Sequence, residues 1–296
     1  MPSISSLRRK IKGVKSTKQI TKAMTMIAGA RLYKAQRNIL NARPFAVKLN
    51  ELLAGLTEKL STQNKINKNW KNDSVHFLLE RNNTNRIGLL VVAGDKGLCG
   101  AFNNNVLRKA SEIITQNKDK EFKLYVVGRK AQEYFKRLGL KVENEYINIF
   151  SKLGFVHAEL IGNDLMKVYK NDKLSKIVLV YNEFKSAIQQ NLIEEQLLPI
   201  ENQEKTNKKY KTNYIYEPDK IILLSSLLPR FVKARIYRVL LESYAAELSA
   251  RMTAMDNASK NAGEMIDNLT LYMNKIRQTN ITRDLADIVG TIEALK

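Results

Sequence analysis

Apolar positions near the amino terminus of this 296-residue chain repeat in steps of three and four, which predicts a long coiled-coil helix. The repeat restarts in a shifted register near residue 20, and we expect the winding to change there. Pro44 lies within the repeat, which resumes after it, so we expect the helix to bend and continue. The apolar members are Ile4, Leu7, Ile11, Val14, Ile20, Ala23, Ile27, Ala30, Ala42, Ala46, Leu49, Leu53, Leu56 and Leu60.

The carboxyl-terminal segment carries a second stripe with the same spacing. We expect its helix to begin near Pro229 and to run for about 60 residues, or roughly 90 Å. Two such stripes at opposite ends of one chain predict a single antiparallel coiled coil; an intermolecular dimer is disfavoured because each helix already has an internal partner. The members of the second stripe are Met255, Ala258, Ala262, Met265, Leu269, Tyr272, Ile276, Ile281, Leu285, Ile288, Ile292 and Leu295.

Between the two stripes, short apolar runs alternate with helical patterns, which is typical of βαβ units. Continuous apolar runs of this length fit strands buried on both faces of a mostly parallel sheet. The middle of the chain is therefore predicted to be a Rossmann-like α/β domain. Strands are expected at 87–93, 122–127 and 176–184, an edge strand at 191–200, and helices at 105–116, 129–138 and 158–169.

Polar stretches without an apolar pattern separate these regions, at 61–73 and at 201–213. The fold class is thus α/β, with a coiled coil of both termini added to the central domain. No apolar run approaches the roughly 20 residues that cross a bilayer, so we predict no membrane insertion. The predicted segments are a helix over 1–60, an α/β domain over 75–200, a flexible loop over 201–217 and a helix over 218–296.

Charge adds a feature that the apolar pattern does not explain. Lys and Arg number 50 against 29 Asp and Glu, a net charge of +21, and the first 50 residues contain no acidic side chain. Such a segment suits a nucleic-acid-binding arm, a targeting peptide, or a helix that faces an acidic protein surface or solvent. The sustained periodicity and the excess of Lys disfavour a targeting peptide. Charge alone does not choose between the others.

Candidate chemistry is sparse. The turn over 94–100 follows a strand and is rich in Gly, but it fits neither nucleotide-binding fingerprint, and a tight turn explains it without a ligand. Cys99 is the single cysteine, and neither His76 nor His157 has a context that suggests a catalytic base. No carboxylate pair, triad or metal-ligand set stands out. We therefore predict no catalytic residue, no cofactor and no metal.

Three groups of motifs lie in order along the whole chain: 20–28 with 34–36, then 95–100 with Asn103, and finally 250–258, 261–262, 274–278 and 281–282. Together they resemble the gamma subunit of F-type ATP synthase. Two departures concern the carboxyl-terminal end, where Asp284 and Asp287 stand for the family's usual Glu, and Thr291 and Ile292 stand where the family often has Gly-Ala.

The resemblance implies a central rotor shaft that couples transmembrane proton flow to conformational cycling of the catalytic beta subunits, without a catalytic site of its own. The implied partners are the alpha, beta and epsilon subunits and the membrane c-ring, with no nucleic acid. By family position, Met24 and Arg251 contact the lever region of beta, and Arg277 and Gln278 engage a loop of an open beta subunit. No leader is recognisable, which favours a peripheral complex on the cytoplasmic face of a bacterial inner membrane.

The competing interpretation is a basic coiled-coil protein that binds nucleic acid. It accounts for the positive charge but not for the ordered motifs.

Overall fold

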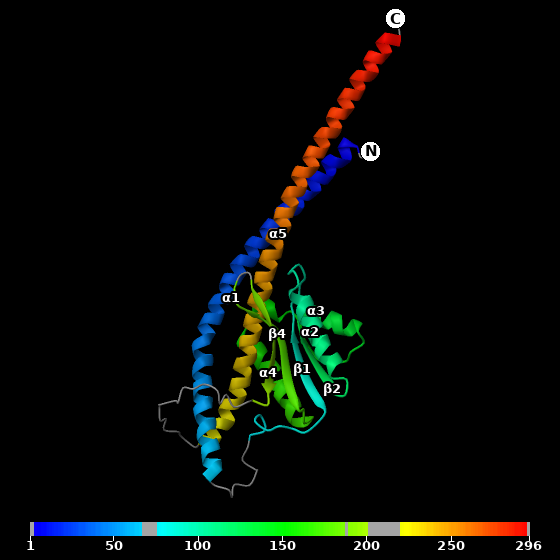
Figure 1. The fold of residues 1–296 in the computed structure, drawn as a ribbon. Helices are drawn as coiled ribbons and strands as arrows, with labels where there is room; N and C mark the ends of the chain where they lie inside the picture. The colour runs from blue at the N-terminus through cyan, green and yellow to red at the C-terminus, as the bar shows by residue number, and fades with distance from the viewer. Residues whose placement is uncertain (1–2, 67–75, 187–188, 201–219, 295–296) are drawn as a thin grey trace. The chain divides into compact units, whose positions relative to one another are not determined.

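A computed structural model describes residues 3–66, 76–186, 189–200 and 220–294. Its residues cluster into two compact units. The terminal unit comprises Met1–Ala30 with Arg251–Lys296, and the central unit comprises Arg31–Ala250. Two long helices, α1 (Ile4–Ile66) and α5 (Lys220–Ala294), contribute to both units (Figure 1).

The central unit contains a five-stranded sheet with the order β3-β2-β1-β4-β5. The first four strands are parallel and β5 pairs antiparallel with β4, which confirms the predicted mostly parallel sheet. Six of the seven residues of β1 are buried, because helices cover both faces of the sheet. The strands are β1 (Arg86–Val92), β2 (Glu121–Val127), β3 (Val142–Tyr146), β4 (Lys176–Phe184) and β5 (Gln190–Leu198).

Helices form a layer on each side of this sheet (Figure 1). One face packs against α2 (Phe102–Gln116) and α3 (Arg129–Arg137). The other face packs against α4 (Phe155–Asn171), which follows the short helix η2 (Ile149–Lys152), and against the first part of α5.

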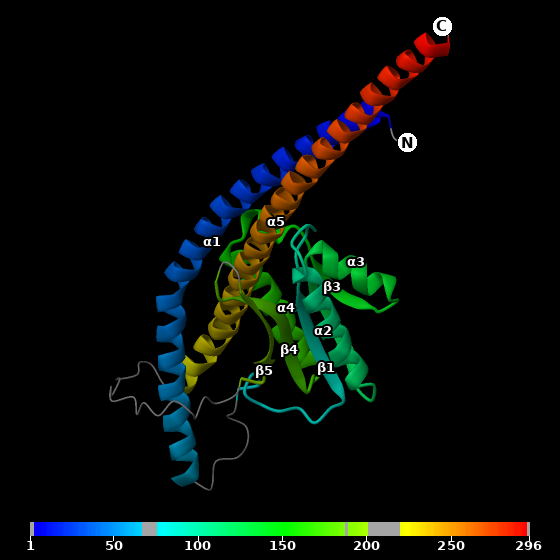
Figure 2. The same ribbon diagram turned by 45° about the horizontal axis from the view of Figure 1, so that its top comes forward.

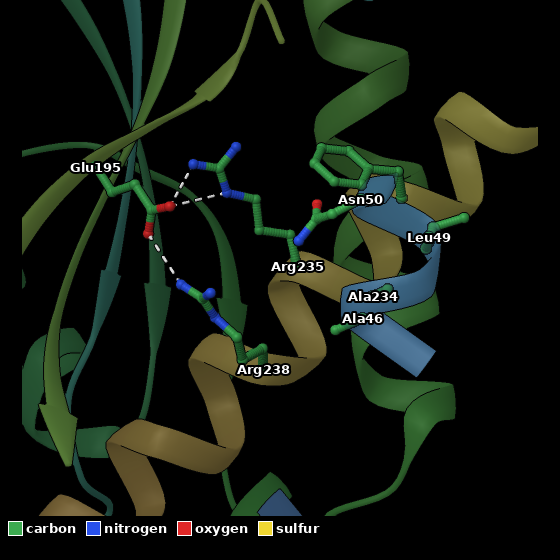
Figure 3. Close-up of a pocket in the computed structure, with 8 residues that line it drawn as sticks. Ala46, Leu49, Asn50, Glu195, Ala234, Arg235 and Arg238 are labelled. Carbon is green, nitrogen blue, oxygen red and sulfur yellow. Dashed lines mark hydrogen bonds and ion pairs between the residues drawn. The ribbon is translucent and has the colours of Figure 1, made fainter. Parts of the chain in front are cut away.

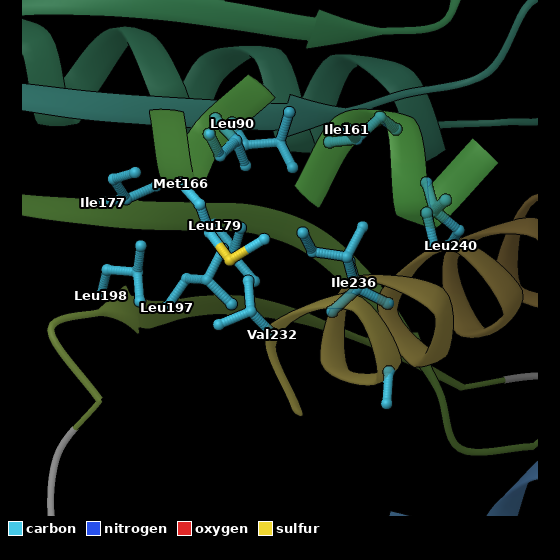
Figure 4. Close-up of a cluster of buried hydrophobic side chains, with 14 of the residues drawn as sticks. Leu90, Ile161, Met166, Ile177, Leu179, Leu197, Leu198, Val232, Ile236 and Leu240 are labelled. Atoms are coloured by element: carbon cyan, nitrogen blue, oxygen red, sulfur yellow. The ribbon is translucent and has the colours of Figure 1, made fainter. Parts of the chain in front are cut away.

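The second of these faces forms the larger apolar core. Figure 4 shows Leu179 of β4, Met166 of α4 and Ile236 of α5 converging there. Leu49 and Leu53 of α1 belong to the same cluster, so this part of α1 packs on the apolar core within the central unit.

Two glycines mark close approaches at the carboxyl ends of the strands. Gly128 has φ +89, and a Cβ there would lie 2.2 Å from the carbonyl oxygen of Ala93, so only glycine fits. A Cβ on Gly94 would lie 2.8 Å from the carboxyl carbon of Glu247 on α5. Packing therefore accounts for Gly128 after β2 and for the close approach at Gly94 after β1, whereas a Cβ on Gly97 of the same turn would meet nothing within 4 Å.

The terminal unit is an antiparallel helix pair, as predicted (Figure 2). The Met252 sulfur lies 3.5 Å from where a Cβ of Gly29 would be, and the Lys18 ammonium lies 3.0 Å from the Cβ position of Gly263. Each step forward along α1 is thus matched by one step back along α5.

The predicted register shift on α1 is wrong. Ile20 and Ile27 are 58% and 55% exposed, whereas Thr21 and Ala28 are buried. The heptad that starts at Leu7 continues unshifted, because a polar residue can occupy its seam: the Thr21 hydroxyl donates to backbone carbonyls of its own helix. A prediction from apolar residues alone therefore assigned the wrong face of α1 to the contact with α5.

The stripe on α5 is confirmed in part. Met255, Ala262 and Ile276 are buried, but Met265 and Tyr272 are about half exposed. The intervening seam positions are Ser259, Ile266 and Met273, all half-buried, and they keep the three-four spacing.

The helix ends also differ from expectation. Helix α5 begins at Lys220, so Pro229 lies inside it and not at its start. Helix α1 extends to Ile66, so residues 61–66 are helical and not linker. The rest of that linker and the predicted loop over 201–217 fall outside the described residues, as do the side chains of Leu56, Leu60 and Leu295.

Candidate functional site

The distal part of α5 carries an apolar stripe that no described residue of α1 covers. By the observed pairing, Ile4 at the start of α1 lies level with Arg277, and α5 continues to Ala294. The stripe follows the heptad spacing and its side chains are 52–58% exposed. We call these residues the distal stripe: Ile281, Leu285, Ile288 and Ile292.

The two departures from the family pattern at this end do not disturb the helix. The Thr291 hydroxyl donates to the Asp287 carbonyl at 2.7 Å, which satisfies its polar atom within α5. Ile292 continues the distal stripe. Exposed apolar surface of this length, on a single helix, indicates a partner with an apolar surface of its own.

The amino-terminal part of α1 supplies a basic face. Its cations are all exposed, and within the described residues none lies within ion-pair distance of a carboxylate. The paired part of α5 differs, because Asp256 and Lys260 there form an ion pair of 2.8 Å. The net positive charge of the terminal unit therefore comes from α1, because acidic residues balance the cations of α5 in this unit. Its members are Arg8, Arg9, Lys10, Lys12, Lys15, Lys18 and Lys22.

The four residues predicted to contact a partner all lie in the terminal unit. Met24 and Arg251 are half-buried on facing helices, and the pairing sets them about six residues, or roughly 9 Å, apart along the axis. Arg277 and Gln278 are exposed where α1 begins, directly before the distal stripe. Their role as contacts stays a prediction.

A polar cluster in the central unit was not predicted (Figure 3). It joins Glu195 of β5 to Arg235 and Arg238 of α5 beside a small cavity of about 50 Å³, which residues of α1 also line. Burial alone would raise the pKa of Glu195, but the charge and hydrogen bonds of Arg235, together with the charge of Arg238, outweigh burial and lower it. Forty positions separate Glu195 from Arg235, so no local motif announces the cluster.

The Gly-rich turn after β1 borders a shallow hollow of about 290 Å³. Several of the polar groups that line it are engaged within the protein: the Asn103 amide oxygen accepts from Gly94 N at 2.9 Å, and Lys130 pairs with Glu133 at 2.6 Å. Asp95 next to it accepts from the backbone N–H groups of Arg129 and Asn148. This turn therefore ties the loops at one edge of the sheet together.

The described part of the chain has neither a metal-binding cluster nor a membrane-spanning helix. Its His, Cys, Asp and Glu residues form no group of three that could hold a metal ion. None of its described helices is long and apolar enough to cross a membrane.

Comparison with known proteins gives consistent matches over the full length. A family model described as ATP synthase matches residues 3–295. The ATP synthase gamma chain of Solibacter usitatus is 39% identical over 290 residues, with 98% of each chain covered. That of Geotalea daltonii is 40% identical over 299 residues, with 100% of each chain covered.

Two solved structures share the fold. A chain of the central stalk and c-ring of Tetrahymena thermophila mitochondrial ATP synthase matches with a TM-score of 0.59 and 24% identity, covering 81% of this chain and 99% of that chain. A chain of Euglena gracilis mitochondrial ATP synthase matches with a TM-score of 0.66 and 16% identity, covering 99% and 94%. At these identities the likeness concerns the fold.

Proposed function

The chain belongs to the ATP synthase gamma-chain family, and we propose that its paired terminal helices form the shaft that turns inside the catalytic head. Proton flow through the membrane ring would turn the shaft, and the differing faces of the shaft would drive each beta subunit through its conformational cycle. The chemistry of ATP would then take place on beta, with this chain as the mechanical link. The distal stripe is the observation that carries this proposal.

The distal stripe needs a partner for energetic reasons. Full burial of a Leu or Ile side chain contributes about 1.5–3 kcal/mol, so four half-exposed side chains leave several kcal/mol unrealised in the free chain. From Arg277 to Ile292 the helix rises about 23 Å, which suits a sleeve formed by several subunits. A ring of alternating alpha and beta subunits provides such a sleeve.

The other implied contacts follow from the same arrangement. Arg277 and Gln278 border the distal stripe, so they would meet a loop of an open beta subunit, and Met24 and Arg251 would face the lever region of beta. The basic face of α1 would meet acidic loops of the head, where unpaired cations are favourable. The central unit would meet epsilon and the c-ring, at the cytoplasmic face of a bacterial inner membrane. The nucleic-acid interpretation gains no support from the relatives.

The test uses co-expression of the full chain with bacterial alpha and beta subunits, followed by ATP-driven proton pumping in membrane vesicles that contain the whole complex. Ile288→Asp introduces a charge into the distal stripe, and we expect pumping to fall about tenfold. Thr279→Asp is the matched control, because Thr279 is exposed on the opposite side of the helix. Equal pumping by the two variants would remove the distal stripe as the contact, and a wild-type chain that binds DNA but neither subunit would refute the shaft.

A further inference from the structure

The polar cluster of the central unit joins one side chain of the sheet to two side chains of α5 (Figure 3). The Glu195 Oε1 atom accepts from Arg235 Nε at 2.9 Å and from Arg235 Nη2, so the guanidinium binds through two of its N–H groups. The Oε2 atom accepts from the Tyr181 hydroxyl of β4 at 2.9 Å and lies 3.7 Å from Arg238 Nη2. Both oxygens of this carboxylate are therefore occupied.

Glu195 and Arg235 are largely shielded from solvent, Arg238 is 41% exposed, and both arginines have further contacts within α5. The side chains of Glu195 and Arg235 are only 20% and 19% exposed. The guanidinium of Arg235 also lies 5.9 Å from the ring centroid of Phe231, one turn earlier on α5. Arg238 is held a second time, because its Nε lies 3.5 Å from Glu242 Oε1. The side chains of Arg235 and Arg238 thus have little freedom to reorient if α5 turns about its axis.

The cluster adds directional contacts to an apolar core whose packing is non-directional. The packing of Val232, Ile236 and Leu240 against the sheet is strong but non-directional, so it opposes separation of α5 more than rotation of α5 about its own axis. Two N–H groups of Arg235 converge on one carboxylate oxygen, and these charge-assisted hydrogen bonds are directional, so they favour one angular setting of α5. Buried ion pairs of this kind add little net stability compared with apolar residues of similar size.

We propose that Glu195, Arg235 and Tyr181 are positioning residues that lock the rotational setting of α5 on the sheet, so that torque on the central unit turns α5 without slippage. Helix α5 continues from this contact into the terminal unit as one helix, which makes it the element that would carry the torque. This inference rests on the proposed shaft function, and it identifies where along the shaft the load is transferred.

The decisive variant removes the directional contact while leaving an apolar contact in its place. Glu195→Leu, Arg235→Met and Tyr181→Phe are combined, so that the three residues lose one another together, and Arg238 keeps its ion pair with Glu242. We expect the melting temperature of the complex to stay within a few degrees of wild type. Protons pumped per ATP hydrolysed in vesicles should fall about threefold to tenfold, and most strongly against a large opposing gradient.

A neighbouring ion pair offers a matched control on the same strand. Glu194 of β5 pairs with Lys109 of α2 at 3.0 Å, so Glu194→Leu with Lys109→Met removes an ion pair of the sheet that does not involve α5. Its ratio of pumping to hydrolysis should equal that of wild type. Glu195→Asp alone keeps the charge with a shorter reach and should fall between wild type and the combined variant.

Each result is informative. A combined variant that pumps as well per ATP as wild type would overturn the inference and leave the shaft intact. A variant whose melting temperature and pumping ratio fall together would reduce the cluster to a stabilising contact and also overturn it. If the wild-type chain supports no pumping with alpha and beta, the proposed function itself fails, and the inference with it.

Discussion

At the scale of single residues, Glu242 on α5 is a carboxyl group in an unfavourable setting. Its side chain is 14% exposed, and its Oε2 atom has no hydrogen-bond partner among the described residues. Burial raises its pKa to about 7; Arg238 opposes the shift, while Glu183 and Glu195 add to it. The group is thus protonated in the folded chain at pH values where it ionises on unfolding.

This linkage gives stability a pH dependence of known sign. Between about pH 4.5 and 7 the folded state holds a proton that the unfolded state has lost, so the free energy of unfolding falls as pH rises through this window and levels off above it. Glu242→Gln should remove this loss, a gain of at most about 3 kcal/mol at pH 8. Melting temperatures at pH 5.5 and pH 8 measure it. A variant that differs from wild type by the same amount at both pH values would contradict the assignment.

At the scale of elements, the sequence predicts helices and strands that have a regular apolar pattern of their own. It misses elements that form only because they pair with or pack on another part of the chain. The run of β4 is apolar over most of its length and its bounds are predicted correctly. Strand β3 was not predicted, because Val142–Tyr146 reads Val-Glu-Asn-Glu-Tyr and is a strand only through its pairing with β2. The cluster at Glu195 was missed for a similar reason, since its members lie on different elements.

Burial between the two helices of the terminal unit also depends on the position of a residue and not only on how apolar it is. Ala28 is 2% exposed and Ile20 is 58% exposed, although isoleucine is the more apolar residue. Ala28→Lys should therefore destabilise the helix pair by about 2–4 kcal/mol, whereas Ile20→Lys should change it by less than about 0.5 kcal/mol in the free chain. Hydrogen exchange of the amides of residues 4–30 reports the difference. If Ile20→Lys destabilised the helix pair more than Ala28→Lys, the predicted shifted register would be correct.

At the scale of the whole molecule, the order of the motifs along the chain indicates the function, whereas composition alone fits a nucleic-acid-binding protein as well. The motif residues Met24 and Arg251 both lie in the terminal unit. The burial pattern therefore indicates a helix pair with an exposed apolar stripe, and only the family resemblance assigns the individual contacts.

Met24→Lys tests that assignment in the assembled enzyme. The pairing leaves roughly 9 Å along the axis between positions 24 and 251, within the combined reach of two long cationic side chains. A new cation near the lever region of beta can be worth about 1–3 kcal/mol in a partly dry interface, and it would over-stabilise one rotary position. We expect assembly and ATP hydrolysis to persist while pumping falls. Met24→Leu, uncharged and similar in volume, should be nearly silent, and equal pumping by the two variants would place Met24 in the core.

The polar seam of α1 has a consequence for the lifetime of the chain before assembly. Between Ile11 and Ala28 the seam is occupied by Lys18 and Thr21 with few large apolar side chains, so this stretch should open locally at low free energy. Opening frees the backbone beside the exposed side chains of Lys12, Lys15, Lys18 and Lys22, and trypsin-like proteases cut after Lys in unfolded segments. A surplus of unassembled chain is therefore the population most readily degraded, and enclosure by partner subunits would protect the same residues from cleavage.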